Sequence, residues 1–99
     1  MDFVLREGAT EIADEEFKGR EELESVTVPD GVKKIGKGAF FGCRGLKEIH
    51  LPDSLTEIGM GAFEGCDGLR KITYHRKNES IVKSAFYEQW RRLQKIVLD

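Results

Sequence analysis

The strongest constraint on the fold of this chain is an internal repeat of 23 residues. Residues 23–45 and 46–68 align without gaps and are identical at 11 of 23 positions. The shared residues are the leading Leu, Pro-Asp, Ile-Gly, Gly-Ala-Phe, Gly-Cys and the closing Gly. Repetition at a period of about 20–50 residues is typical of a solenoid, in which each turn buries its apolar side against the next. The repeat therefore predicts a stack of similar turns.

Weaker copies of the pattern extend the repeat over the whole chain. Upstream, five residues fall one period before their counterparts in residues 23–45, namely Phe3, Leu5, Ile12, Phe17 and Gly19. Downstream, a divergent turn continues the frame, and one extra residue then precedes Leu93, Ile96 and Leu98. We predict one domain over residues 1–99, with turns at about 1–22, 23–45, 46–68 and 69–92 and a partial turn over 93–99.

The third turn shows how each unit is built. Ile49 and Leu51 alternate with polar residues, which is the pattern of a half-buried strand, and Pro52 ends the strand because proline cannot donate to a ladder. A second short extended piece follows at residues 55–58, and glycines then allow a tight corner that carries Phe63 into the core. Stacked turns place equivalent strands in a parallel sheet, about 4.8 Å apart.

The fourth turn differs from this pattern. Ser80 is expected to cap a helix over about residues 81–92. Phe86 and Trp90 are four residues apart and therefore lie on the same, inner side of that helix, which leaves Tyr87 as an exposed aromatic residue.

The consensus LxxIxLPxxLxxIGxxAFxGCxxL, which residues 23–74 follow closely, resembles the 23-residue repeat of the BspA-like (Treponema pallidum type) leucine-rich repeat family. The resemblance implies a right-handed leucine-rich-repeat solenoid of the α/β type, with a parallel sheet on one face, about four turns and a final strand. It also implies a protein-binding role, in a family often found at the surface of host-associated bacteria or secreted by them. The family offers no catalytic residue to carry over. Gly31 and Ser54 replace the asparagine that commoner leucine-rich repeats use.

Motifs that resemble cofactor or metal sites are explained better by the repeat. Gly36-Lys37-Gly38 and its repeat copy share a glycine pattern with dinucleotide loops. Such a loop also needs a preceding strand, a following helix and an acidic residue about twenty positions further on. The two cysteines and two histidines lack the CxxC-like or HxxxH spacing of a zinc site. No nucleophile and base are suitably spaced, so we expect no enzymatic activity, no cofactor and no metal.

The two cysteines occupy the same repeat position. Cys43 and Cys66 are therefore predicted to lie on adjacent turns, about 5 Å apart, which would allow a disulfide. Buried free thiols that pack as small apolar groups are favoured over a bridge, since nothing else in the sequence indicates an oxidising compartment.

Charge and hydropathy argue against nucleic-acid and membrane partners. Sixteen basic residues against 18 acidic ones give a net charge of −2, which removes the simplest electrostatic case for nucleic-acid binding. No stretch approaches the roughly 18 apolar residues of a membrane span, and residues 1–16 lack the basic and apolar regions of a signal peptide. We expect a cytoplasmic location for the chain as given, or the cell surface or secretion if it is a fragment of a longer family member.

The outward row of the predicted sheet is the first candidate binding site. On successive strands it comprises Ser25 and Thr27, Glu48 and His50, Lys71 and Thr73, and Lys95 and Val97. Such a row is a pre-ordered binding surface in repeat proteins. Five strands make a sheet only about 20 Å wide, whose flat area is below the roughly 800 Å² per partner of a standard interface. We therefore predict a module that binds an unidentified protein partner weakly through this face.

Charge order along the solenoid is the second candidate feature. Residues 1–30 hold ten acids and three bases, whereas residues 69–99 hold eight bases and three acids. Ordinary solvation of two end turns explains this order and is slightly favoured. The alternative is self-association, with the acidic end of one molecule stacked on the basic end of another. Its candidate residues are Asp14, Glu15, Glu16, Arg91 and Arg92.

Overall fold

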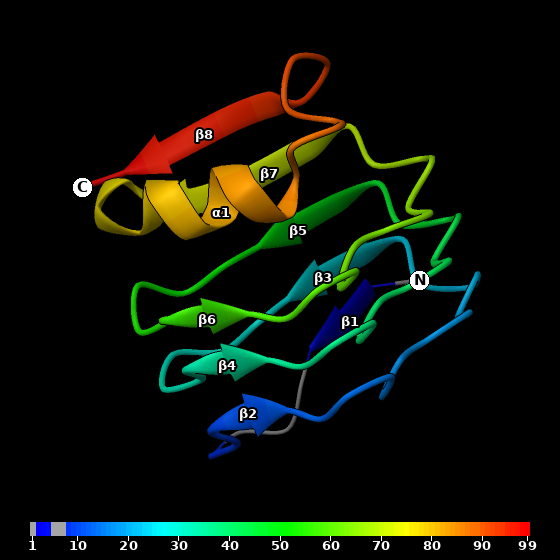
Figure 1. The fold of residues 1–99 in the computed structure, drawn as a ribbon, viewed down its shortest axis with the longest axis horizontal. Coiled ribbons are helices and arrows are strands. Elements are labelled where there is room, and N and C mark those ends of the chain that lie inside the picture. The colour runs from blue at the N-terminus through cyan, green and yellow to red at the C-terminus, as the bar shows by residue number, and fades with distance from the viewer. Residues whose placement is uncertain (1, 5–7) are drawn as a thin grey trace.

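Each of the first three turns contributes two short strands, one to each of two parallel sheets (Figure 1). The computed structural model describes residues 2–4 and 8–99, with side chains from residue 8 onward, so the predicted inward position Leu5 lies outside the described residues. Sheet A has the order β1-β3-β5-β7-β8 and consists of β1 (Asp2–Val4), β3 (Ser25–Thr27), β5 (Glu48–His50), β7 (Lys71–His75) and β8 (Gln94–Leu98). Sheet B has the order β2-β4-β6 and consists of β2 (Glu11–Ile12), β4 (Lys34–Ile35) and β6 (Glu57–Ile58).

The strand register follows the 23-residue period. Ser25 pairs with Glu48, and Glu48 pairs with Lys71. The apolar residues one position further on are fully buried and aligned in the same way, namely Val26, Ile49 and Ile72. A one-residue slip would turn these side chains toward solvent, so burial fixes the register. The predicted leucine-rich-repeat solenoid is thus confirmed.

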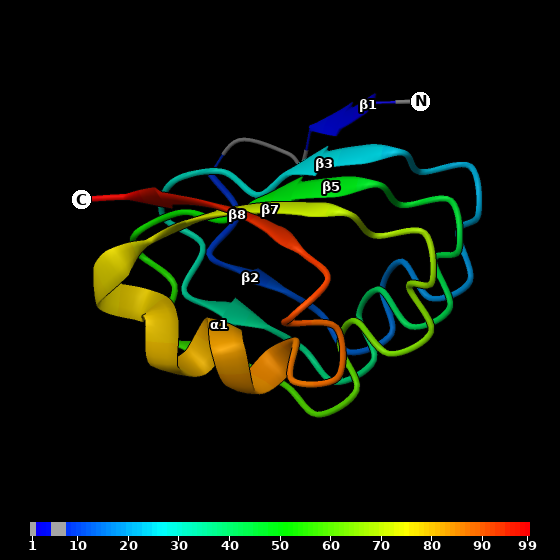
Figure 2. The same cartoon turned by 90° about the horizontal axis from the view of Figure 1, so that it is seen from above.

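A column of phenylalanine rings runs through the core along the stack of turns. The rings of Phe17, Phe40, Phe63 and Phe86 stack in that order, with centroids 5.3, 5.3 and 4.4 Å apart. All four side chains are buried. Figure 2 shows the two sheets as opposite walls, joined by the glycine-containing corners of successive turns. Ring stacking adds to the free energy gained by burying each aromatic side chain.

Polar side chains link neighbouring turns where sheet A leads into sheet B. The Ser54 hydroxyl accepts a hydrogen bond from the Gly31 N–H (3.0 Å) and donates one to the Val32 carbonyl (2.8 Å). One turn later, the Asn78 amide donates to the Leu55 carbonyl (2.8 Å). Ser54 therefore supplies the inter-turn bonds for which the commoner leucine-rich repeats use asparagine.

The fourth turn replaces its sheet B strand with helical structure. Arg76–Asn78 form a 3₁₀ helix, η1, and Glu79–Ala85 form the helix α1. The prediction of a helix over residues 81–92 capped by Ser80 is wrong in both bounds and cap, since Asn78 is the N-cap residue. Figure 1 shows α1 next to β6, where a fourth strand of sheet B would continue the stack.

The helix ends early because the following aromatic residues pack into the core. Phe86 leaves the helical conformation at φ −109° and ψ 27°, and its ring stacks on that of Phe63. Trp90 then lies against Tyr74, with ring centroids 5.8 Å apart. Phe86 and Trp90 thus pack inward as predicted. Their packing ends the helix at this point.

Replacement of three glycines explains the change of path in the fourth turn. The glycines of the third turn, Gly59, Gly61 and Gly65, are succeeded 23 residues later by Val82, Ser84 and Glu88. A Cβ atom at Gly59 would lie 2.6 Å from the Lys37 nitrogen, and Gly61 and Gly65 have φ angles of +70° and +79°. A residue with a Cβ atom would clash with the preceding turn at position 59 and would be strained at the positive φ angles of positions 61 and 65. The fourth turn therefore cannot stack on the third in the same way.

Candidate interaction surface

The central strands of sheet A place two rows of side chains on its outer face. Residues Ser25, Glu48 and Lys71 form one row, and Thr27, His50 and Thr73 form the next. Each row follows from strand alternation, because the intervening residues are fixed in the core. The structure thus brings six of the eight predicted face residues together on β3, β5 and β7.

Glu48 is the centre of a polar cluster on this outer face. Its carboxylate accepts a hydrogen bond from the Ser25 hydroxyl (3.3 Å). The same carboxylate lies 3.6 Å from His50 Nε2 and 3.7 Å from Lys71 Nζ. These contacts cross three strands and order side chains that are about one-third exposed. The cluster therefore presents a fixed arrangement of one carboxylate, one ammonium group and one imidazole.

The electrostatics of the cluster favour an ionised Glu48. Partial burial raises the pKa of this carboxyl, but Lys71, His50 and the Ser25 hydroxyl together outweigh that effect. The net result is a pKa below the usual value. Glu48 is therefore negatively charged at neutral pH and offers an acceptor to a partner.

Thr73 lies in the second row but is not accessible. Only 8% of the residue is exposed, since it is flanked by His50 on β5 and by Ile96 on β8. The prediction that Thr73 contributes to a binding surface is therefore wrong, although its position on the strand is as predicted.

The predicted orientation of β8 is also wrong. Lys95 pairs with Ile72 and Val97 pairs with Tyr74, so both lie in register with buried residues. Val97 packs against the core, and the Lys95 ammonium donates to the carbonyl oxygens of Trp90 (2.6 Å) and Leu93 (3.1 Å). Lys95 also lies 4.8 Å from the centroid of the Trp90 ring. Neither side chain belongs to the outer face.

The outer face of sheet A at β8 is formed instead by three residues that the sequence analysis did not identify, namely Gln94, Ile96 and Leu98. Gln94 pairs with Lys71 and Ile96 with Thr73, so the ladder keeps the 23-residue period in β8. Ile96 is half-buried, and Leu98 is 41% exposed. Counting 23 residues from Lys71 would have identified them, whereas the pattern Leu93-x-x-Ile96 pointed to the opposite face. The outer face therefore changes from polar at β3 and β5 to partly apolar at β8.

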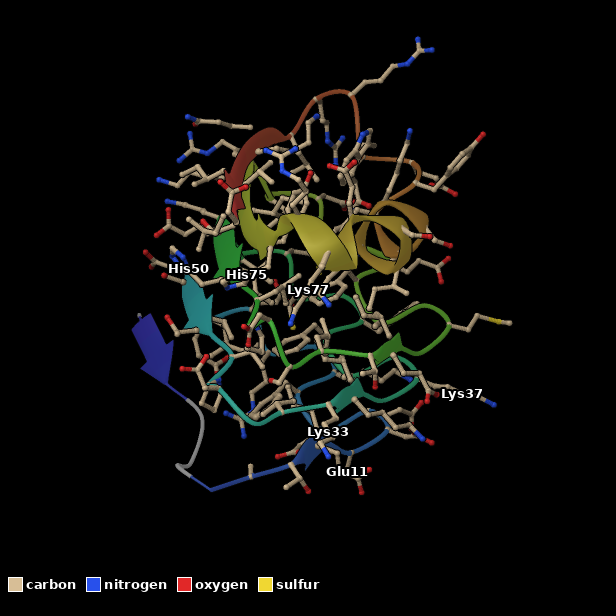
Figure 3. All side chains as sticks on the ribbon, turned by 90° about the vertical axis from the view of Figure 1, so that its left-hand side faces the viewer. Glu11, Lys33, Lys37, His50, His75 and Lys77 are labelled. Atoms are coloured by element: carbon tan, nitrogen blue, oxygen red, sulfur yellow. The ribbon has the colours of Figure 1, made fainter. Side chains whose placement is uncertain are left out.

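A second histidine extends the outer face beyond the cluster. His75 ends β7 and pairs with Leu98. Figure 3 shows His50 and His75 on the same side of the molecule, whereas Lys33, Lys37 and Glu11 lie toward sheet B. The partly exposed His75 thus lies beside the apolar part of the outer face.

The predicted self-association residues at the acidic end make contacts within the stack. Asp14 accepts the Lys37 N–H (2.9 Å), and Glu16 accepts the Ala13 N–H (2.8 Å). Glu15 pairs with Lys18 at 3.2 Å. The three carboxylates remain exposed, but each has a local structural role.

At the basic end, Arg91 and Arg92 are exposed in the segment between α1 and β8. Among the described residues, no ion pair involves either arginine. The structure therefore keeps the two charged ends apart within one chain and leaves the basic end available.

Both cysteines are buried free thiols in the structure, as favoured by the sequence. Their Sγ atoms donate to backbone carbonyls, Cys43 to Phe17 and Cys66 to Phe40. Burial raises the pKa of both thiols, and with the nearby Cys43 it raises that of Cys66 to about 12. A protonated, enclosed thiol is a poor nucleophile.

Two further properties concern the described residues as a whole. They contain no group of three or more His, Cys, Asp and Glu side chains suited to holding a metal ion. Within the same residues, no helix has the length and apolar character needed to cross a membrane.

The parallel strands, phenylalanine column and inter-turn bonds define a leucine-rich-repeat protein. A family model described as BspA type leucine rich repeat region (6 copies) matches residues 5–99. The chain belongs to this BspA-type leucine-rich repeat family.

Two solved structures show the same fold. A leucine-rich repeat protein from Bacteroides ovatus matches with a TM-score of 0.72 and 23% identity, over 99% of this chain and 30% of that one. A leucine-rich repeat protein from T. pallidum matches with a TM-score of 0.70 and 26% identity, over 97% of this chain and 51% of that one. This chain spans about half the length of the second protein and less than a third of the first. Comparison with curated proteins gives no match.

Proposed function

We propose that this chain is a non-enzymatic protein-interaction module that binds a partner through the outer face of sheet A. The observation that carries the proposal is the polar cluster around Glu48, because it fixes polar and charged side chains on three adjacent strands. Fixing these groups before binding lowers the entropic cost of association. The leucine-rich-repeat fold supports such a role, since its strands form an ordered face for recognition.

The outer face combines two kinds of recognition. The Glu48 cluster suits a polar partner with complementary charges, whereas Ile96 and the exposed Leu98 offer apolar area at β8. The four strands from β3 to β8 span roughly 15 Å. This width is small for a standard interface, so binding by this chain alone is expected to be weak.

Binding measurements with a double variant test this proposal. Lys71→Glu combined with His50→Ala reverses the charge at residue 71 and removes the imidazole, and should abolish binding to partners captured by the unmodified protein. Lys37→Glu combined with Thr10→Ala is a matched control on the sheet B side, where both residues are exposed. Retained binding by the first variant, at the affinity of the control, would refute the proposal.

The second candidate function is self-assembly from end to end. Its support is the charge order of the chain, with net −7 in residues 1–30 and +5 in residues 69–99. Arg91 and Arg92 are available for such pairing. Light scattering behind a sizing column should then show a mass that grows with concentration at low salt and decreases at high salt. Arg91→Glu with Arg92→Glu should abolish growth, and Lys71→Glu should leave it unchanged. A constant monomer mass under all conditions would refute this function.

A further inference from the structure

Backbone hydrogen bonds between the glycine corners of successive turns stop at the third turn. Three N–H groups of the first turn donate to the second, from Glu15, Phe17 and Gly19 to the carbonyls of Lys37, Ala39 and Phe41. The equivalent groups of the second turn donate to the third, from Gly38, Phe40 and Gly42 to the carbonyls of Met60, Ala62 and Glu64. Each corner therefore needs carbonyl oxygens from the turn that follows it.

The third corner lacks these acceptors. The N–H groups of Gly61, Phe63 and Gly65 have no hydrogen-bond acceptor among the described residues. Gly61 and Gly65 have φ angles of +70° and +79°, close to the +61° and +73° of Gly38 and Gly42. The backbone of the third corner therefore directs its donors as the second corner does, toward the next turn. Phe63 itself is only 1% exposed, so its unmet donor lies in a buried residue.

The helix α1 is the reason for the missing acceptors. By the spacing of the earlier turns, the carbonyls of Lys83, Ala85 and Tyr87 would accept these three bonds. Lys83 and Ala85 lie in α1, where carbonyl groups point along the helix axis, and Tyr87 accepts from Trp90. The fourth turn thus covers the third without completing its hydrogen bonds.

Carbonyl groups at the adjoining strand β6 lack hydrogen-bond donors. In the second turn, the carbonyls of Lys33, just before β4, and of Ile35, in β4, accept bonds from the third turn. Their equivalents are the carbonyls of Thr56, just before β6, and of Ile58, in β6, and these have no donor among the described residues. Ile58 is also only partly buried, whereas Ile35 is fully buried. The edge of the third turn therefore offers two acceptors and then three donors along residues 56–65.

A groove runs along this edge, between the third turn and α1. It consists of two cavities of about 410 and 440 Å³ that share Gly61, Ser84 and Ala85 in their walls. Gly61 and Gly65 line the first cavity and Ile58 the second, so three of the five unsatisfied positions reach the groove. The most exposed large apolar and aromatic side chains of the described residues also line it, namely Met60 (85% exposed) and Tyr87 (78% exposed).

The charges in the groove select among partners for these hydrogen bonds. Glu64, Asp67 and Glu88 line the first cavity, against the single base Arg92. The acidic lining disfavours free carboxylates and phosphates and favours basic side chains. It also disfavours a second copy of this chain, because the first turn, whose outer edge is complementary to that of the third turn, carries Asp14, Glu15 and Glu16.

We propose that this groove binds a basic peptide segment in an extended conformation. The segment donates an N–H group to the Ile58 carbonyl and accepts bonds from the N–H groups of Gly61 and Gly65, as an added strand does at an open sheet edge. Its basic side chains lie near Glu64, Asp67 and Glu88, and its apolar side chains contact Met60 and Tyr87. This site is separate from the outer face of sheet A, so the two can be tested independently.

Amide hydrogen exchange tests the free protein first. The N–H groups of Gly61 and Gly65 should exchange faster than those of Gly38 and Gly42, which are matched by position in the repeat and are hydrogen-bonded. Equal protection of the two sets would mean that the third corner is already satisfied, and would overturn the proposal.

Titration with a defined probe tests binding. The probe is a capped heptapeptide of alternating Lys and Val, added to ¹⁵N-labelled protein while amide chemical shifts are recorded. We expect saturable shifts centred on Gly61 and Gly65, and increased protection of these amides. A capped peptide of alternating Glu and Val should bind at least about tenfold more weakly. Absent binding, shifts centred on sheet A, or equal affinity for the two peptides would each overturn the proposal.

Two pairs of variants locate the bound peptide. Ser84→Trp fills the groove from the exposed side of α1 and should abolish binding, whereas Lys83→Trp, on the same helix but outside the groove, should not. Glu64→Lys with Asp67→Lys should weaken binding about tenfold or more. The control for this charge change is Glu21→Lys with Asp30→Lys, at exposed sites outside the groove. Binding that survives both groove variants would refute the assignment.

Discussion

The third and fourth turns have related sequences but different structures, and the difference shows what the repeat requires. Both place an isoleucine in sheet A, Ile49 and Ile72, and both add a phenylalanine to the stacked column, Phe63 and Phe86. The third turn then forms β6 and a glycine corner, whereas the fourth forms α1. Apolar residues therefore suffice to fix sheet A and the phenylalanine column. The path between them depends on residues that permit close backbone approach and left-handed conformations.

This comparison also accounts for the unusual surface beside α1. A turn that stacks closely on its predecessor forms hydrogen bonds with the backbone of that predecessor. In a helix, the backbone groups form hydrogen bonds with one another instead. The fourth turn therefore closes the apolar core of the third turn but leaves backbone groups of that turn without hydrogen bonds among the described residues.

Loss of a ring from the interior of the column should have the largest effect. The Phe63 ring stacks between Phe40 and Phe86, so Phe63→Ala removes contacts that join the regular turns to the divergent one. We expect a loss of about 3–5 kcal/mol in the free energy of unfolding, measured by urea denaturation. Phe41→Ala, at a neighbouring exposed position, is the control and should cost far less. Equal effects would mean that the column does not hold the turns together.

A methyl group at the closest backbone approach should have the next largest effect. Gly59→Ala would place a Cβ atom 2.6 Å from the Lys37 nitrogen and 2.8 Å from the Gly36 carbonyl carbon, so the third turn must move away from the second. We expect the free energy of unfolding to fall by about 1–3 kcal/mol, again measured by urea denaturation. Met60→Ala, at the adjacent exposed residue, should change stability little. A negligible effect of Gly59→Ala would contradict the steric explanation for the helical path at Val82.

These glycines also show which parts of the fold the sequence could predict. The register of β3, β5 and β7 was predictable, because apolar residues recur at Val26, Ile49 and Ile72 and burial selects one face. The bounds of α1 were not, since its end depends on Phe86 stacking on Phe63 from the preceding turn. A helix-forming pattern alone contains no information on that contact.

The same distinction applies to the candidate site. On β3 and β5 only one face is apolar, so alternation identified Ser25, Thr27, Glu48 and His50 as outward residues. On β8, apolar residues occupy both faces, and alternation could not choose between them. Hydrogen bonding to β7 decides the outcome and turns Ile96, rather than Lys95, outward. The groove beside α1 was not predictable, because it results from hydrogen bonds that the fourth turn fails to make.

Alanine at equivalent positions of the two turns should have opposite effects on stability. Gly61 has a φ angle of +70°, so Gly61→Ala should cost about 1–2 kcal/mol of backbone strain. Ser84, 23 residues later, is exposed in α1, where alanine should stabilise by about 0.5 kcal/mol through its higher helix propensity. Thermal unfolding of the two variants would measure both shifts. Shifts of the same sign would contradict the structural difference between the turns.

The smallest predicted effect concerns the polar cluster and depends on pH. The pKa of Glu48 is lower in the folded protein than its ordinary value of 4.5, so folding is stabilised by the ionised carboxyl above that pH. This contribution is lost as pH falls through the folded pKa. Glu48→Gln should therefore destabilise the protein by about 0.5 kcal/mol at neutral pH, with the difference disappearing once the pH is well below the folded pKa of Glu48.

A double-mutant cycle separates charge from packing in this effect. Lys71 Nζ lies 3.7 Å from the Glu48 carboxylate, so a Lys71→Met background removes the main attraction that lowers the pKa. In that background, the pH-dependent part of the Glu48→Gln difference should shrink, measured by urea denaturation at neutral and acid pH. The Glu48→Gln change in the free energy of unfolding could instead be the same at both pH values, or be unaffected by Lys71→Met. Either result would mean that Glu48 stabilises the face by packing. The outer face would then lack the ordered charges on which its proposed role in binding depends.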